Sequence, residues 1–325
     1  MSWLVTGGAG YIGGHVVRAL QDAGEEVVVV DDLSTGEEHR TGSAPLVVGS
    51  VLDRDLVRAT MKEHSVHGVV HIAAKKQVGE SVERPLHYYE ENVEGLRRLL
   101  EVVVETGVEN LLFSSSAAVY GMPDVDLVTE STPCLPESPY GETKLVGERM
   151  ISAVAAATGL RYANLRYFNV AGAGTPELAD TACANLVPMV FERLQQGLPP
   201  RIFGDDYPTP DGTCVRDYIH VSDIASAHAL AAQRLATRDL SALTFNVGTG
   251  QGASVREMVD LIRATTGTAD DPRFEPEVTP RRPGDPARVV ASADAIAEVL
   301  GWRAQHSLQE MVESAWEGWQ ARAQQ

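Results

Sequence analysis

Cysteines, basic residues and long apolar segments are all scarce in this sequence. Its 325 residues include three cysteines without the spacing of a metal site, which points to reduced thiols rather than a disulfide framework. The 27 lysines and arginines are outnumbered by 45 acidic residues, and the net charge of −18 argues against nucleic-acid binding. No apolar run approaches the ~18 residues of a membrane span, and we expect no signal peptide because the first residues lack its basic flank and apolar region. We therefore expect a cytoplasmic protein that binds neither nucleic acid nor membrane.

A glycine-rich turn opens the sequence. The apolar segment Trp3–Thr6 predicts a strand, and GGAGYIG follows it at Gly7–Gly13. Its glycine spacing lets the backbone approach a pyrophosphate at the N-terminus of the next helix. A second apolar strand ends at Asp31 and Asp32, at about the distance from the turn expected of a carboxylate that binds the adenosine ribose. Because a carboxylate would repel a 2′-phosphate, the pattern predicts a site for NAD rather than NADP.

Strands and helices alternate through the first half of the chain. Further strands are predicted at Glu26–Val30, Leu46–Val48, Gly68–Ile72, Asn110–Ser114 and Arg161–Arg166. Helices are predicted at Gly14–Ala23, Asp53–His64, within Ser81–Thr106 as one long helix, and at Pro139–Thr158. This order predicts an α/β protein with a Rossmann-like doubly wound parallel sheet, which binds its ligands beyond the carboxyl ends of the strands. We place this NAD-binding domain at residues 1–170.

A smaller C-terminal α/β substrate lobe is expected at residues 171–325, where glycine and proline are frequent and the elements shorter. Segments near 214–247 are expected to return to the first domain, because Thr244–Val247 can rejoin the main sheet. Ser222 is expected to cap the helix that follows it, and capping boxes are expected at Ser254 and Ser307. A stripe of apolar residues on the last helix, with Trp316 and Trp319, predicts lobe core or a subunit contact. The remaining elements are predicted at Asn185–Gln196 (helix), Arg201–Phe203 (strand) and Arg288–Ala291 (strand).

Two groups of side chains invite a ligand hypothesis. Guanidinium groups in loops suit bidentate contact with a diphosphate, and this chain offers Arg201, Arg216, Arg281 and Arg282. His67 and His71 flank and enter a strand and lack the spacing of a helical metal motif, so we expect structural roles and no metal site.

The stretch SPYGETK at Ser138–Lys144 carries the candidate chemistry. Tyr140 and Lys144 are four residues apart, so a helix places them on one face, one turn apart. A tyrosine that acts as a base near pH 7 needs its pKa lowered by roughly three units from ~10. One ammonium ~4 Å away in a partly screened site supplies about that much, and a bound nicotinamide cation would add to it. The serine run Ser114–Ser116, at a predicted strand end, offers further hydroxyl groups.

Together these motifs resemble the extended short-chain dehydrogenase/reductases, and within them the UDP-glucose 4-epimerases, over almost the whole chain. GGAGYIG, SSSAAVYG, SPYGETK and YFNVAGA are similar to motifs of nucleotide-sugar enzymes in general. AAKKQVGESV, GDDYPTPDGT followed by VRDYIHV, and RRPGD resemble the epimerases in particular. The resemblance implies an isomerase of galactose metabolism that uses NAD to interconvert UDP-galactose and UDP-glucose. It also implies a homodimer built from the helices of Ser81–Thr106 and Pro139–Thr158.

The resemblance implies site residues by position. Those matching the catalytic set are Ser116, Tyr140 and Lys144. Those matching cofactor contacts are Gly7, Gly10, Tyr11, Ile12, Gly13, Asp31, Asp32, Ser34, Gly36, Ser50, Val51, Ala73, Ala74, Lys76, Asn92, Ser114, Tyr140, Lys144, Tyr167 and Phe168. Those matching UDP-sugar contacts are Lys76, Ser116, Ala117, Ala118, Tyr140, Asn169, Asn185, Leu186, Arg201, Phe203, Arg216, Tyr218, Arg282, Asp285 and Val289.

The implied mechanism begins with Tyr140 as a phenolate, which takes the proton from the sugar O4′ while Ser116 hydrogen-bonds the same oxygen. Hydride passes from C4′ to tightly bound NAD, and the 4-keto sugar turns over while the UDP stays anchored. Arg216 and Arg282 would hold the diphosphate, and Phe203 would lie near the uracil. Hydride then returns to the other face.

Three positions bear on specificity. Ser50 stands where the family usually has an aspartate on the adenine amino group, and Ala118 stands where it usually has a threonine near the sugar. Val289 stands where epimerases restricted to UDP-glucose and UDP-galactose tend to carry a tyrosine. The smaller side chain leaves room for an N-acetyl group, so we predict additional activity on UDP-N-acetylglucosamine and UDP-N-acetylgalactosamine. The alternative is that Val289 starts a strand and simply faces the core.

These residues also bear on three alternative functions. A nucleotide-sugar 4,6-dehydratase needs an acid–base pair after the catalytic serine, and Ala117 and Ala118 cannot transfer a proton. A 4-epimerase acting on UDP-glucuronate or a UDP-pentose stays open, as does a catalytically inactive NAD-binding regulator. The intact Ser116, Tyr140 and Lys144 set argues against the regulator.

Overall fold

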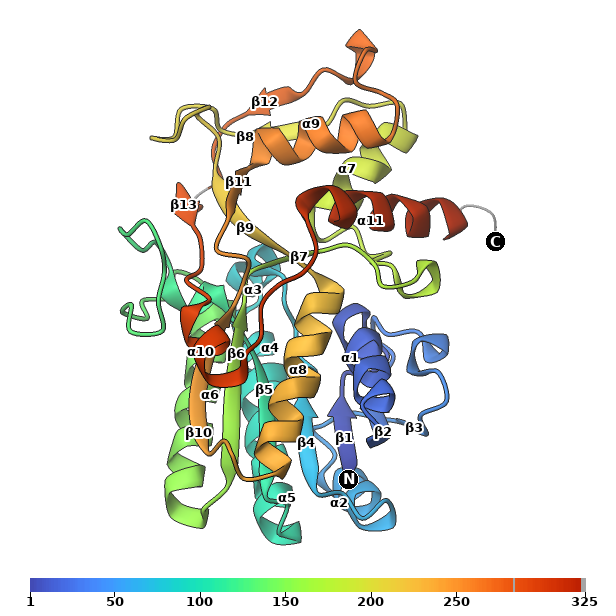
Figure 1. Cartoon of the computed structure of the whole chain (residues 1–325), viewed down its shortest axis with the longest axis vertical. Coiled ribbons are helices and arrows are strands. Elements are labelled where there is room, and N and C mark those ends of the chain that lie inside the picture. The colour runs from blue at the N-terminus through green and yellow to red at the C-terminus, as the bar shows by residue number, and fades with distance from the viewer. Residues whose placement is uncertain (283, 323–325) are drawn as a thin grey trace.

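A parallel sheet of seven strands forms the larger part of the computed structural model, which describes residues 1–282 and 284–322 (Figure 1). The strand order is β10-β6-β5-β4-β1-β2-β3, and every neighbouring pair is parallel. The strands are β1 (Ser2–Thr6), β2 (Glu26–Asp31), β3 (Leu46–Val48), β4 (Gly68–His71), β5 (Asn110–Ser116), β6 (Arg161–Tyr167) and β10 (Ala242–Val247). The predicted doubly wound sheet is therefore confirmed, including the return of the late strand β10 to its edge.

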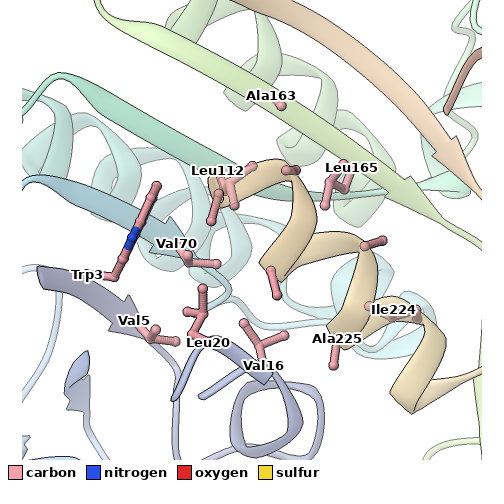
Figure 2. Close-up of a cluster of buried hydrophobic side chains, with 14 of the residues drawn as sticks. Trp3, Val5, Val16, Leu20, Val70, Leu112, Ala163, Leu165, Ile224 and Ala225 are labelled. Atoms are coloured by element: carbon pink, nitrogen blue, oxygen red, sulfur yellow. The ribbon is translucent and has the colours of Figure 1, made fainter. Parts of the chain in front are cut away.

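Helices cover both faces of this sheet. The helices are α1 (Tyr11–Asp22) and α8 (Val221–Ala236) on one face, and α2 (Arg54–Glu63), α5 (Gly95–Thr106) and α6 (Pro139–Thr158) on the other. Successive side chains of a strand point to opposite faces of the sheet, so alternate residues pack against the helices on each face. Trp3 and Val5 pack with α1 and α8, and Leu4 packs with α2 and α5. Figure 2 shows the first layer, where sheet residues Trp3, Val5, Val70, Leu112 and Leu165 meet Val16, Leu20, Ile224 and Ala225 of the two helices.

The long helix predicted within Ser81–Thr106 is interrupted. The chain forms α3 (Val78–Glu83), α4 (Pro85–Tyr88) and a π-helical turn (Tyr89–Glu94) before α5 begins. Arg84 leaves the helical region, with φ −130° and ψ 56°, because a proline disfavours helical geometry in the residue before it.

Two predicted helix starts also differ from the structure. Helix α1 begins at Tyr11 rather than Gly14, because Gly10 is its N-cap and the glycine turn runs directly into the helix. Ser222 does not cap α8; His220 does, through an Nδ1 that accepts the Ser222 N–H at 3.0 Å. The capping boxes predicted at Ser254 and Ser307 are confirmed by reciprocal bonds with the glutamates three residues later.

The smaller group of elements lies beyond the carboxyl ends of the parallel strands (Figure 1). It comprises α7 (Leu186–Gln195), α9 (Val255–Thr265), α11 (Leu308–Arg322), a sheet of β7 (Asn169–Ala171), β9 (Val215–His220), β11 (Gly252–Ser254) and β13 (Arg288–Val289), and the pair β8 (Arg201–Phe203) and β12 (Glu277–Thr279). Its core includes Phe191, Met311 and Trp319, so the predicted apolar stripe of the last helix packs inside the lobe. Helix α10 (Asp294–Leu300) packs instead with the main sheet, through Ile296 and Leu300.

Candidate active site

The predicted cofactor residues gather along the carboxyl edge of the parallel sheet. The glycine turn follows β1, the segment from Asp31 to Gly36 ends and follows β2, and Ser50 and Val51 follow β3. Ala73, Ala74 and Lys76 follow β4, Ser114 lies near the end of β5, and Tyr167 and Phe168 end and follow β6. Residues that are spread over 160 positions of the sequence therefore lie at one edge of the sheet, and this is the edge at which such sheets bind their ligands.

The glycine turn has the shape of a phosphate cradle. Gly7 adopts φ +74°, which favours glycine, and a Cβ on Gly13 would lie 2.0 Å from the Gly7 carbonyl oxygen. Helix α1 has no side-chain cap at Gly10, so its first N–H groups are offered to an anion. The Tyr11 hydroxyl points to the lobe and donates to the Gly172 carbonyl at 2.5 Å.

The end of β2 and the segment after β3 border an open hollow of about 820 Å³. Asp32 and Ser50 line it, together with Leu52, Asp53, Arg54, Asp55, Arg58, Glu91 and Arg98. The Ser50 hydroxyl accepts the Leu52 N–H at 3.1 Å. Asp31 is buried and accepts the N–H groups of Ala9 and Leu33, both at 2.9 Å. The hollow and the carboxylates fit an adenosine with free ribose hydroxyls.

Asn92 holds the loop after β4. Its amide oxygen accepts the Lys75 N–H at 2.8 Å, and its amide nitrogen donates to the Lys75 carbonyl and the Thr143 hydroxyl, at 2.9 Å and 3.0 Å. The side chain is buried, so we assign it the role of fixing this loop. Lys75, which the sequence did not single out, donates to the Ser34 hydroxyl at 3.1 Å and so joins the segments that follow β4 and β2.

Tyr140 and Lys144 lie on the buried face of α6. The helix begins as the SPYGETK motif predicts, with Pro139 in its first turn and the Ser138 hydroxyl accepting the Gly141 N–H at 3.2 Å. Lys144 donates from Nζ to the Ser114 carbonyl at 2.8 Å.

The electrostatics of this pair differ from the expectation for the tyrosine. Burial raises the pKa of Tyr140, and a hydrogen bond with Ser116 opposes the rise. Burial lowers the pKa of Lys144 to about 8, against the opposing effect of the Glu148 carboxylate. The predicted lowering of the Tyr140 pKa is therefore absent from the protein alone, because desolvation dominates. A phenolate at Tyr140 then depends on additional positive charge, such as that of a nicotinamide cation.

A buried ion pair behind this face was not predicted. Glu148 accepts two hydrogen bonds from the Arg166 guanidinium, at 2.8 Å and 2.5 Å, and a third from the Ser115 hydroxyl at 2.5 Å. The sequence does contain one signal for Glu148: it follows Lys144 by four residues, as Lys144 follows Tyr140, and so lies on the same face of the helix one turn further on.

The predicted UDP-sugar residues come from several elements of the lobe. Asn169 opens β7, and Asn185 stands at the N-cap position of α7 without a side-chain cap bond and directly before Leu186. Phe203 ends β8, and Tyr218 lies in β9. Arg216 pairs with Asp285 at 2.5 Å, and the Arg282 guanidinium lies 3.8 Å from the centre of the Phe203 ring. A backbone bond of 3.3 Å from Asp285 N–H to the Arg282 carbonyl joins these two contacts. The residues matched to the diphosphate and to the uracil are therefore neighbours; Pro283 between them lies outside the described residues.

Other predicted contacts are already engaged. Arg201 pairs with Glu277 at 3.1 Å and Arg281 with Asp206 at 2.6 Å, so the structure does not join them to Arg216. Tyr218 is buried in the lobe core, where burial raises its pKa.

Ala117 and Ala118 lie in a short helical turn that follows β5 (Ala117–Tyr120). Similar turns are formed elsewhere by Glu38–Thr41, Pro176–Leu178 and Pro272–Phe274. Val289, in β13, is 7% exposed and packs in an apolar cluster with Phe168, and Ala117 borders that cluster. Val289 thus faces a core, and this core is adjacent to the predicted sugar site.

The metal and membrane hypotheses find no support in residues 1–282 and 284–322. No group of three or more metal-ligating side chains lies together there. His71 is buried and hydrogen-bonded to the Thr6 hydroxyl at 2.7 Å, as a structural histidine would be. No helix in this part of the chain has the length and apolar character needed to span a bilayer.

Comparison with known proteins agrees with this geometry. Residues 3–248 match the model of the NAD dependent epimerase/dehydratase family. The chain is 46% identical to a UDP-glucose 4-epimerase of Azospirillum brasilense, over 97% of this chain and 91% of that protein. It is 44% identical to one of Halalkalibacterium halodurans, over 97% and 95%. A crystal structure of the enzyme from Stenotrophomonas maltophila, with bound NAD and formylated UDP-arabinopyranose, superposes with a TM-score of 0.93 at 42% identity and covers 100% of this chain and 99% of that one.

Proposed function

Because the chain belongs to the NAD-dependent epimerase/dehydratase family and is closely similar to its UDP-glucose 4-epimerases, we propose that it interconverts UDP-galactose and UDP-glucose with NAD as cofactor. The observation that carries this proposal is that Ser116, Tyr140 and Lys144 come together at the carboxyl edge of the sheet, the edge that also carries the glycine turn. This is the geometry needed to move a proton at a sugar hydroxyl next to a nicotinamide.

The residues present fit NAD. The Gly7–Gly13 turn and the free N–H groups of α1 suit the pyrophosphate, and Asp31 and Asp32 suit the ribose hydroxyls. Ser50 offers adenine a hydroxyl rather than a carboxylate, so we expect a weaker contact there. When bound, NAD supplies the acceptor and donor for the hydride of the sugar C4′.

Tyr140 acts on the proton of the sugar 4-hydroxyl. In this mechanism its phenolate removes that proton as C4′ is oxidised and returns it after the sugar has turned. Ser116 donates a hydrogen bond to the same oxygen, and the Lys144 ammonium favours the phenolate form of Tyr140. Burial of Tyr140 keeps water away from the reacting oxygen.

The lobe anchors the nucleotide while the sugar turns. Arg216 and Arg282 are cations suited to the diphosphate, and Asp285 orients Arg216 through their 2.5 Å contact. The Arg282 guanidinium covers one face of the Phe203 ring, and the other face would take the uracil. With recognition placed on the UDP, the sugar is free to present either face.

The test is incubation of the purified protein with UDP-galactose and no added NAD, followed by an assay of UDP-glucose. Formation of UDP-glucose is the expected result. A 4-keto-6-deoxy product would indicate the dehydratase, which Ala117 and Ala118 already disfavour. Turnover only with UDP-glucuronate or a UDP-pentose would indicate an epimerase of that sugar, and NAD binding without any turnover would indicate the regulator.

A second activity is favoured by Val289. Its side chain is small and the apolar cluster around it borders Ala117, so replacement by a larger residue would narrow the sugar site. We therefore infer that UDP-N-acetylglucosamine and UDP-N-acetylgalactosamine are also interconverted. Absence of this reaction at saturating substrate would contradict the inference.

We also propose a cytoplasmic homodimer. Cys134, Cys183 and Cys214 are free thiols, which suits a reducing compartment. Apolar side chains are exposed on α3 and α4, where Val82 is 62% and Leu86 81% accessible. Burial of such side chains between two copies would contribute to association. Light scattering at micromolar concentration tests the dimer, and a monomer would refute it.

A further inference from the structure

The buried face of α6 continues past the reaction centre. Tyr140, Lys144 and Glu148 follow one another at intervals of four residues, so they share one face over three turns. The serine run of β5 lies against this row. The Ser114 carbonyl accepts from Lys144 at 2.8 Å, and the Ser115 hydroxyl donates to Glu148 at 2.5 Å. One strand therefore fixes the positions of both ionisable groups behind Tyr140.

Glu148 cannot easily turn away from this row. Its carboxylate is buried and both of its oxygens accept hydrogen bonds from Arg166 of β6, at 2.8 Å and 2.5 Å. Arg166 also donates to the Tyr120 hydroxyl at 2.8 Å, and Tyr120 donates in turn to the Asn246 side chain at 2.7 Å. The pair is thus held by elements from three parts of the chain.

Lys144 needs such a partner because its ammonium is itself buried. Burial lowers its pKa to about 8, and Glu148 is the group that opposes this fall. His71 at the end of β4 and His228 of α8 lie nearby, and burial lowers their pKa values to about 3 and about 4, so both are neutral near pH 7. Tyr140 and Tyr167 are also uncharged there, because burial raises their pKa values. Among these neighbours Glu148 supplies the negative charge.

We propose that Glu148 is a positioning residue for the reaction: held by Arg166 and Ser115, its carboxylate keeps the Lys144 ammonium charged beside Tyr140. This inference rests on the proposed function, because a charged Lys144 matters only where Tyr140 exchanges a proton. A purely structural ion pair would affect folding but would leave the titration of Lys144 unchanged.

The experiment measures kcat against pH for the wild type and for E148Q/R166Q. The double substitution removes both charges together, because E148Q alone leaves a buried arginine without a partner. Glu148 is the charge that opposes the fall in the pKa of Lys144, so its loss disfavours the ammonium, and the loss of the Arg166 cation offsets part of this effect. The alkaline limb of the profile should therefore move to lower pH, and turnover at about pH 9 relative to about pH 6.5 should fall about threefold further than in the wild type.

Two variants serve as controls. E148D keeps the charge but withdraws it by one methylene group, and its alkaline midpoint should lie between those of the wild type and the double variant. Y120F removes a hydroxyl from the same network without a change of charge, so its midpoint should equal that of the wild type. Equal midpoints in wild type, E148D and E148Q/R166Q would overturn the proposal.

A second readout separates this inference from the proposed function. The NMR titration of Lys144, followed through ¹³C-labelled lysine side chains, requires no substrate and no access of a reagent to this buried amine, and it reports the fraction of neutral amine against pH. A lower midpoint in E148D, and in E148Q/R166Q if it folds, supports the role of Glu148 even where no epimerase activity is found. Identical titration midpoints would refute that role even in an active enzyme.

Discussion

Replacing Gly13 with alanine tests whether the turn between β1 and α1 is a dinucleotide cradle. The new Cβ would lie 2.0 Å from the Gly7 carbonyl oxygen and 2.7 Å from the Gly8 Cα, whereas ordinary contacts begin at 3.4 Å. Both neighbours are backbone atoms, so no side-chain rotation relieves the clash. The turn must open by more than an ångström, which displaces the N–H groups at the start of α1.

The magnitude follows from two terms. Overpacking of this kind costs about 1–3 kcal/mol, which lowers the melting temperature of a chain this large by roughly 2–10 °C. Each displaced N–H group that fails to reach a phosphate forfeits about 1.5–3 kcal/mol of charged hydrogen bonding. The affinity for NAD should therefore fall at least about tenfold, more than the change in stability alone would suggest.

The assay is the amount of NAD that stays with G13A through gel filtration, released by heat and measured per protein chain, with the melting temperature recorded alongside. The matched control is G79A, because a Cβ at Gly79 in α3 meets no atom within 4 Å. G79A should retain NAD and melt like the wild type. If G13A also retains NAD fully and melts within a degree of the wild type, the cradle argument is wrong.

Three further predictions concern the reaction and the stability of the fold. Y140F should lower kcat by about 10²–10⁴-fold or more without a change in melting temperature, since it removes the proton-transferring group; near-normal turnover would refute its assignment. V289Y should suppress turnover of N-acetylated UDP-sugars by about 5- to 150-fold, as overpacking of about 1–3 kcal/mol implies, while UDP-galactose turnover persists; equal losses on both substrates would argue against a specificity role. Burial lowers the pKa values of His71 and His228 to about 3 and about 4. Below about pH 6.5 these two histidines therefore bind protons in the unfolded chain but stay neutral in the folded chain. Urea unfolding should therefore show stability that is present above about pH 6.5 and lost progressively toward pH 4, and a flat profile over that window would contradict the burial of neutral histidines.

Local patterns in the sequence were sufficient to predict the sheet and much of the site. The apolar strand at Trp3–Thr6, the glycine turn and the carboxylates after β2 each carry their signal within a few residues. The SPYGETK motif likewise predicted the first turn of α6 and the shared face of Tyr140 and Lys144. Such features depend on backbone propensity and on side-chain spacing, and both can be read from one short segment of the sequence.

The features that escaped prediction depend on contacts between distant segments. Glu148 and Arg166 meet because α6 packs on β6. The four-residue spacing places Glu148 on the face of Tyr140 and Lys144, but it does not indicate that Arg166 is its partner. The rise in the pKa of Tyr140 depends on how completely other elements bury it, which spacing does not report. His220 displaced Ser222 as the cap of α8 because the orientation of an imidazole is set by its surroundings.

The last strand of the main sheet is synthesised long after its neighbour. β10 pairs with β6 from Ala242↔Tyr162 to Val247↔Tyr167, so roughly 80 residues separate the completion of the two strands. At about 5–20 residues per second, a nascent chain exposes the unpaired edge of β6 for roughly 4–16 s. During much of that time α8 is also missing from the apolar face around Val16 and Leu20. The newly made chain is therefore most open to edge-to-edge aggregation while the lobe is being translated, and chaperone dependence should be greatest in that interval.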